Sequence, residues 1–123
     1  KRLGWESARA MNPFAGLLAR GVALGFGSDG MPFGPLAGLD GAVRHPHPRE
    51  RLTVGQALRA YTLDAAAISG LGGLARPLEA GRRADLAVLS DNPFLKGGFS
   101  GIEVVAVYRR GSRVAGSGRG PMV

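Results

Sequence analysis

The chain has 123 residues, of which 45% are hydrophobic, with no cysteine and a formal net charge of +7. This is the length of one ordinary domain or of a piece of a larger one, and the apolar content excludes a disordered chain. No apolar run is long enough to span a membrane, no signal peptide is recognisable, and a disulfide framework is excluded. We therefore expect a cytoplasmic protein without a membrane partner.

The first elements in chain order are a helix and a short strand. Residues 12–20 (NPFAGLLAR) predict a helix that Asn12 caps and that Gly21 ends in the left-handed conformation. Residues 22–26 (VALGF) are a short apolar run bounded by glycines, which is typical of a strand buried in a parallel sheet.

The middle of the chain predicts a loop followed by two helices. Residues 31–43 are rich in glycine and proline and predict a long loop, which residues 45–51 continue as an exposed turn. Residues 53–61 predict an amphipathic helix, because Thr and Gln stand at capping-box spacing before an apolar stripe. Residues 62–69 predict a second short helix, with Thr62 as its cap.

The last part of the chain predicts β-structure. Residues 84–90 (ADLAVLS) predict a strand, and residues 91–94 (DNPF) predict a turn. Residues 102–117 alternate apolar and polar side chains around Arg-Gly-Ser, which predicts a β-hairpin. The spacing of the apolar residues therefore changes near residue 71, from a mixture of helices and a strand before it to strands after it.

The positive charge raises the question of a polyanionic partner. The arginines are spread along the chain, and the densest cluster is Arg44, Arg49 and Arg51. No basic stretch is interleaved with aromatic residues, as a single-strand binder would need. We therefore expect a solvated basic surface and no nucleic-acid partner.

The motif GSDG at residues 27–30 places one carboxylate, Asp29, directly after the predicted strand 22–26. Ser-Asp-Gly is also ordinary turn chemistry. By itself the motif leaves both a turn residue and a functional carboxylate open.

Four segments together resemble one known family: NPFAGLLARGVALGFGSDG, RLTVGQALRAYTLDAAAISG, GLARPLEAGRRADLAVLSDNPF and VVAVYRRGSRV. In this order they resemble the C-terminal portion of metal-dependent amidohydrolases, and most closely the formamide-deformylase-like branch. The resemblance implies an α/β fold: the last strand and helices of a (β/α)8 TIM barrel, followed by strands of a small β-sandwich. It implies that residues 1–71 belong to the barrel and residues 72–123 to the sandwich.

The resemblance also implies a reaction, the hydrolysis of amide or other C–N bonds by a metal-activated water. Asp29 would follow the last barrel strand, at the end of the barrel where active sites are built. There it would be a catalytic residue and a metal ligand or neighbour, taking a proton from the metal-bound water and passing it to the leaving nitrogen. The implied cofactor is a divalent metal, with zinc expected, and the implied partner is a small amide substrate that the sequence does not identify.

The chain departs from the family pattern in what it lacks. His45 and His47 form a His-x-His pair, but each precedes proline in a predicted loop and neither follows a strand, so we expect solvent-exposed or loop-packing side chains. A catalytic metal needs about three protein ligands, and a whole barrel takes roughly 250 residues. With Asp29 as the one candidate ligand, we expect a C-terminal fragment that is inactive and binds no metal tightly alone. The missing barrel half or a homo-oligomer would complete it.

A second interpretation remains open. The chain could be a non-enzymatic basic binding module built on an amidohydrolase-derived scaffold.

Overall fold

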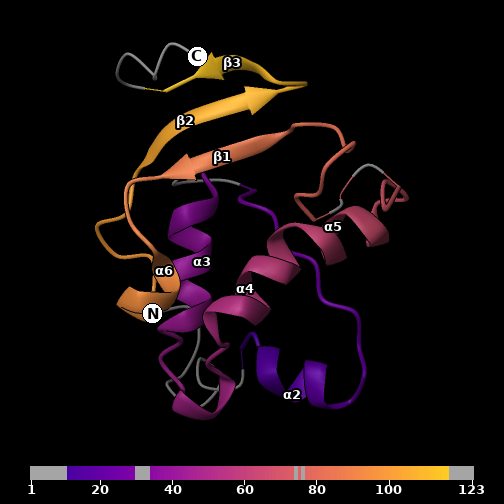
Figure 1. Ribbon diagram of the computed structural model, residues 1–123. Helices are drawn as coiled ribbons and strands as arrows, with labels where there is room; N and C mark the ends of the chain where they lie inside the picture. Colours follow the sequence, from indigo (N-terminus) through magenta and orange to yellow (C-terminus); the bar gives the residue numbers. More distant parts are fainter. Residues whose placement is uncertain (1–10, 30–33, 74, 76, 117–123) are drawn as a thin grey trace.

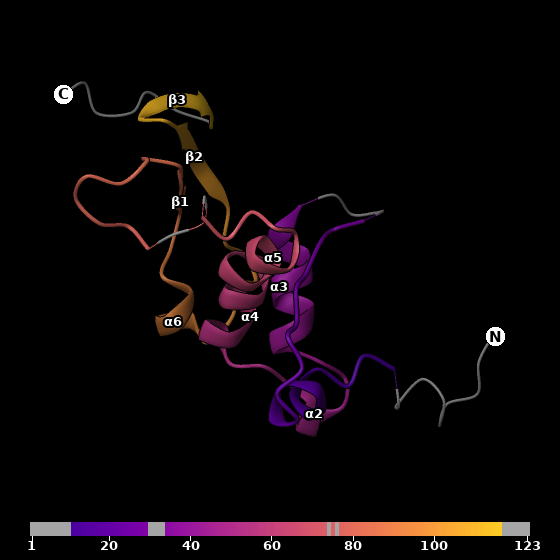
Figure 2. The same cartoon turned by 90° about the vertical axis from the view of Figure 1, so that its right-hand side faces the viewer.

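The computed structural model describes residues 11–29, 34–73, 75 and 77–116, which combine helices with a small sheet (Figure 1). In chain order the elements are α2 (Phe14–Ala19), α3 (Pro35–Val43), the 3-10 helix η1 (Pro48–Glu50), α4 (Val54–Tyr61), α5 (Leu63–Ile68), β1 (Leu86–Leu89), α6 (Pro93–Lys96), β2 (Val104–Arg109) and β3 (Ser112–Ala115). The three strands lie together at one end of the molecule, and α2 to α5 lie below them (Figures 1 and 2). In the described ranges, no helix is both long and apolar enough to cross a membrane.

The sheet is antiparallel, with the strand order β1-β2-β3. The strand predicted over 84–90 and the hairpin predicted over 102–117 are both confirmed, with shorter bounds than expected. Arg110 and Gly111 connect β2 to β3 with φ angles of 52° and 80°. Two consecutive positive φ values give the tight turn whose twist matches that of the flanking strands. The predicted turn at 91–94 leads into α6.

The core lies among the helices. It contains six buried residues, to which α3, α4 and the flanking loops all contribute: Leu39, Ala42, Leu52, Val54, Ala57 and Phe99. The predicted helix over 53–61 is confirmed as α4, and its capping box forms. The Thr53 side chain accepts the Gln56 N–H at 3.2 Å, and the Gln56 side chain accepts the Thr53 N–H at 2.9 Å.

The predicted loop over 31–43 is wrong for most of its length, because Pro35–Val43 is helix α3 (residues 31–33 lie outside the described part). Pro35 stands in the first turn, where its missing N–H costs no hydrogen bond. Leu39 and Ala42, three residues apart, are both buried in the core. Packing of this face therefore outweighs the low helix propensity of the glycines in the same stretch.

Of the two predicted helix caps, Asn12 does not hold the N-cap position of α2, whereas Thr62 holds that of α5 without a side-chain cap bond. Asn12 has a φ of 55°, and Pro13 holds the N-cap position of α2, so the Asn12 side chain makes no cap bond. Thr62 precedes α5 as predicted, but its hydroxyl donates to the Leu58 carbonyl at 2.7 Å and not to the helix it precedes. Gly21 does end α2 in the left-handed conformation, with a φ of 73°.

Candidate functional site

The segment that carries Asp29 runs from Val22 to Asp29, after α2, and passes alongside α4 and α5 (Figures 1 and 2). The strand predicted at residues 22–26 is not formed: the segment is irregular and does not join the sheet. A strand forms only where a neighbouring strand takes up its main-chain hydrogen bonds, and the described part of the chain brings no strand beside this segment.

Helices, and not neighbouring strands, make the contacts that fix the position of this segment. The Phe26 N–H donates to the Ala60 carbonyl of α4 at 3.0 Å. Gly25 lies so close to α5 that a β-carbon on it would stand 3.1 Å from the Ala65 Cα. The segment is therefore attached to α4 and α5 at Gly25 and Phe26, three to four residues before Asp29.

Aromatic rings add to this attachment. The Phe26 ring meets the Phe14 ring of α2 edge to face, with centroids 4.9 Å apart, and meets the Tyr61 ring of α4 at 6.0 Å. Tyr61 packs on Phe26. Its hydroxyl oxygen is shielded from solvent, and no hydrogen-bond partner for it lies within the described ranges.

Asp29 itself is exposed and lies outside any helix. Its φ of 45° places it in the left-handed region, which few residues other than glycine adopt and which aspartate tolerates better than most. In the described structure its carboxylate forms neither an ion pair nor a hydrogen bond with another residue.

The histidine pair lies in the loop between α3 and η1. His45 is buried, with 7% of its surface exposed, and its Nδ1 accepts the His47 N–H at 3.1 Å. The His45 ring also packs edge to face on Phe14, at a centroid distance of 5.5 Å. His47 is half-buried. These are contacts of loop-packing histidines.

The described residues do not fit a metal site of their own. Nowhere in residues 11–29, 34–73, 75 and 77–116 do three His, Cys, Asp or Glu side chains gather as metal ligands would. A single carboxylate such as that of Asp29 does not hold a divalent cation in a protein.

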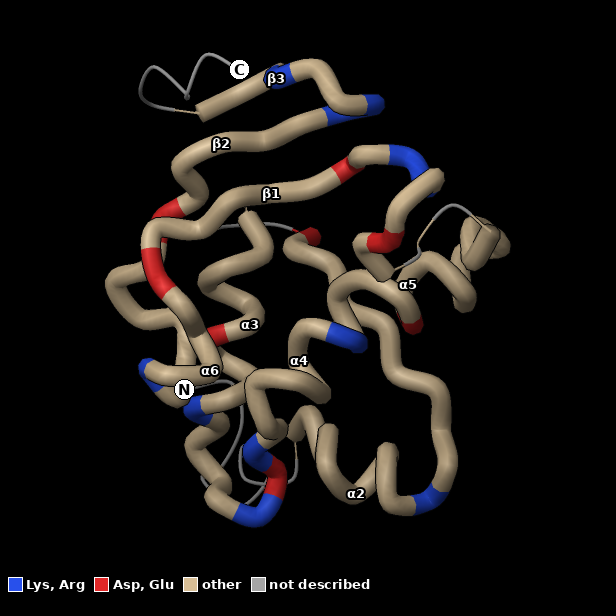
Figure 3. The backbone as a smooth tube through the Cα atoms, in the orientation of Figure 1, with Lys and Arg blue, Asp and Glu red and all other residues tan. Residues whose placement is uncertain are grey.

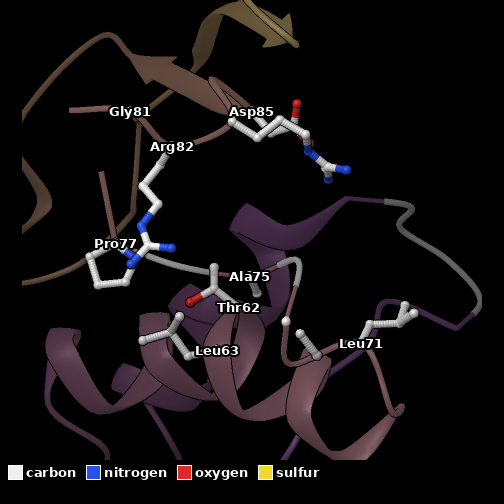
Figure 4. Close-up of a pocket in the computed structure, with 11 residues that line it drawn as sticks. Thr62, Leu63, Leu71, Ala75, Pro77, Gly81, Arg82 and Asp85 are labelled. Atoms are coloured by element: carbon white, nitrogen blue, oxygen red, sulfur yellow. Dashed lines mark ion pairs between the residues drawn. The ribbon is translucent and has the colours of Figure 1, made fainter. Parts of the chain in front are cut away.

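A cavity of about 830 Å³ lies between α5 and the connection that leads to β1 (Figure 4). Its lining combines apolar side chains of the helix with charged side chains of the connection, among them Thr62, Leu63, Leu71, Pro77, Arg82 and Asp85. Sequence reasoning did not find this cavity, although its lining residues all lie between Thr62 and Asp85, because it forms only where the connection to β1 folds back on α5. Asp29 is not part of its lining, so the cavity and the exposed carboxylate are separate features.

The charged groups of this cavity are engaged with their neighbours. Arg82 pairs with Glu79 at 3.4 Å, and Arg83 pairs with Asp85. The Arg110 N–H donates to Asp85 at 2.7 Å and, together with the Arg83 charge, lowers the pKa of this carboxyl below its ordinary value. These groups are arranged as local ion pairs and not as an acid–base pair.

Lysine and arginine are distributed over the surface, with several at the end opposite the sheet (Figure 3). Two members of the cluster singled out from the sequence make internal contacts. Arg44 pairs with Asp40 at 3.2 Å, and Arg51 donates to the His45 carbonyl at 3.0 Å. Part of the cluster's hydrogen-bonding capacity therefore serves the loop that it surrounds.

The described part of the chain is a mixed helix-and-sheet structure in which helices hold the segment that ends at the exposed Asp29. The model of the Amidohydrolase family matches residues 1–115, and the chain belongs to this family. No curated protein and no solved structure gives a significant match. The resemblance to amidohydrolases is therefore confirmed at the level of the superfamily.

Proposed function

We propose that this chain is the C-terminal part of a metal-dependent amidohydrolase of the formamide-deformylase-like branch, and that the complete enzyme hydrolyses amide or other C–N bonds while this part alone is inactive. The observation that carries the proposal is an exposed Asp29, pinned by helices, in a chain that matches the Amidohydrolase family over residues 1–115. Residues 1–71 would contribute to the barrel and residues 72–123 to the sandwich. The cysteine-free composition supports a reducing compartment such as the cytoplasm.

Asp29 is the group that moves the proton in this proposal. Its carboxylate accepts a proton from the water whose oxygen bonds to the amide carbon. As the C–N bond breaks, the same carboxyl returns the proton to the leaving nitrogen. General base and acid roles then alternate on one side chain, as proton transfer in such hydrolysis requires.

The cofactor would be a divalent metal, most simply zinc, held by ligands beyond the described residues. Asp29 would add one carboxylate to that set. Because a metal site needs about three protein ligands, this chain alone would neither retain a metal nor catalyse hydrolysis.

Partners would complete the site. The segment 22–29 makes few main-chain hydrogen bonds in the described structure, with N–H donors at Val22 and Phe26. Unpaired backbone groups of this kind are satisfied by neighbouring strands. Either the other part of the barrel or a second copy of the chain would supply them. Sedimentation distinguishes these, since a self-completing chain would be an oligomer at low micromolar concentration.

The test is Asp29→Asn in the hydrolase that carries this chain, assayed with small amide substrates. We expect the rate to fall by about 10²- to 10⁴-fold, the usual contribution of a general base. Asp64→Asn is the matched control, because Asp64 pairs with Arg59 in α4 and should leave the rate unchanged. Full activity of the Asp29 variant would contradict the proposal. Salt-sensitive retention on heparin without any hydrolysis would instead support the basic binding module.

A further inference from the structure

Four aromatic rings form a continuous row through the helical part of the molecule. His45 meets Phe14 at 5.5 Å, Phe14 meets Phe26 at 4.9 Å, and Phe26 meets Tyr61 at 6.0 Å. Each contact is edge to face, with interplanar angles of 63° to 73°. This is a preferred geometry of aromatic pairs. The row connects the loop after α3, the helix α2, the segment 22–29 and the helix α4.

His45 is the buried end of this row. The proposed reaction makes no use of it, although buried polar side chains are uncommon. Its Nδ1 is satisfied within the loop by the His47 N–H. The remaining surface of the ring therefore serves packing, and its described aromatic partner is Phe14.

A second contact fixes α2 on the same loop region. The Gly16 N–H, in the first turn of α2, donates to the Glu50 carboxylate of η1 at 2.9 Å. Phe14 and Gly16 thus attach one turn of α2 at two points, one apolar and one polar. With α2 fixed in this way, the Phe14 ring has a defined place against Phe26.

Phe26 stands three residues before Asp29. Its ring is held between Phe14 and Tyr61, and its N–H is bonded to the Ala60 carbonyl. We infer that His45 is a positioning residue for Asp29: through Phe14 and Phe26 its ring fixes the segment that presents the carboxylate. The inference rests on the proposed function for the role of Asp29, while the positioning itself is measurable without any activity.

The test separates the ring of His45 from its hydrogen bond. In His45→Phe the ring remains and the acceptor is lost, whereas in His45→Asn an acceptor remains and the ring is lost. His47→Asn is the matched control, a change in the same loop outside the row. Amide hydrogen exchange of Phe26 in the full chain reports how often its bond to Ala60 opens. The Ser90 amide, bonded to the Glu103 carbonyl beside the sheet, is the internal reference.

We expect Phe26 to exchange about tenfold faster in His45→Asn, the effect of losing one well-packed aromatic contact. His45→Phe and His47→Asn should stay within about twofold of the unsubstituted chain, and Ser90 should not change in any variant. The Asp29 amide resonance should shift in His45→Asn alone.

Other outcomes overturn the inference. Faster exchange in His45→Phe but not in His45→Asn would assign the effect to the hydrogen bond, and equal exchange in the two variants would show that the ring makes no difference. Acceleration of Ser90 would show global destabilisation. If His45→Asn does not fold, Phe14→Leu interrupts the same row with less loss of apolar volume, and unchanged Phe26 exchange there overturns the inference. Failure of Asp29→Asn to lower hydrolysis would refute the proposed function and leave the positioning intact.

Discussion

Gly25 is the position in the segment that carries Asp29 where the packing against α5 leaves no room for a side chain. A β-carbon built on Gly25 would lie 3.0 Å from the Ile68 Cδ1 and 3.1 Å from the Ala65 Cα. Favourable carbon–carbon contacts lie at about 3.5–4.0 Å, so an added methyl group overlaps both atoms by roughly half an ångström. The Ile68 methyl is the end of an exposed side chain and can turn away. The Ala65 Cα belongs to the α5 backbone and cannot.

The expected cost follows from this difference. Overpacking against a fixed backbone costs about 1–3 kcal/mol, and the reduced freedom of the unfolded chain returns about 0.4–1 kcal/mol. Gly25→Ala should therefore lower the free energy of unfolding by about 1–2 kcal/mol. Gly27 is the matched control, because a β-carbon there meets no atom of the described residues within 4 Å. Gly27→Ala should raise the free energy of unfolding by about 0.4–1 kcal/mol.

Urea unfolding of both variants, followed by circular dichroism, measures the difference. The two should be separated by about 2 kcal/mol, or about 8 °C in thermal midpoint for a chain of this length. Adding Ile68→Val to Gly25→Ala should restore only part of the loss, since the contact with Ala65 remains. Equal stability of the Gly25 and Gly27 variants would refute the close packing of the segment on α5.

Three further predictions concern α3, the pH response and metal content. Gly38→Ala places a methyl group 3.1 Å from the Tyr61 ring and should destabilise the chain, whereas Gly41→Ala in the same helix meets nothing within 4 Å and should stabilise it by about 1 kcal/mol; thermal unfolding compares them. The pKa of Asp85 is lowered in the folded chain, so its carboxylate stabilises the fold at a pH above its ordinary pKa of 3.8, and this stabilisation is lost as pH falls through the still lower folded pKa. Asp85→Asn should therefore be destabilising in urea at pH 7, and its effect should become smaller as pH falls below 3.8. Elemental analysis after dialysis against a weak chelator should find no stoichiometric metal on the chain, and one tightly held metal per chain would refute the reading of its ligand set.

The elements that could be predicted from the sequence are those fixed by neighbours in the chain. The capping box of Thr53 and Gln56 lies within four residues, so α4 is visible as a pattern. The hairpin is visible for the same reason, because Arg110-Gly111 determines the turn that joins its two strands. Both depend on interactions that a short window contains.

The sequence-based predictions were wrong where contacts between distant parts of the chain determine the secondary structure. Helix α3 contains two glycines and begins at a proline, and it forms because Leu39 and Ala42 reach a core that Phe99 completes from the other end of the chain. The apolar pattern of residues 22–26 indicates burial correctly in part, since Leu24 and Phe26 pack against this core. It could not indicate which element would cover them, and in the described structure helices do so.

The candidate site divides in the same way. The GSDG motif and the family resemblance identify Asp29 as a candidate, but neither predicts its left-handed φ or the ring row that ends at His45. Those features depend on α2, α4 and the loop before η1 meeting in space. The position of the carboxylate is thus set by contacts that no single motif contains.

This arrangement bears on how a complete hydrolytic site would be assembled. The segment before Asp29 is attached to α4 by the Phe26 hydrogen bond and to α5 by the contact at Gly25, both within this chain. Its position therefore does not depend on a strand neighbour, although its unpaired backbone groups remain available to one. A barrel strand added beside it would find the carboxylate already placed and would need to bring only the other ligands. The contacts with α4 and α5 would hold the Asp29 segment before a partner is bound, whereas pairing with a barrel strand would require residues 22–26 to become extended.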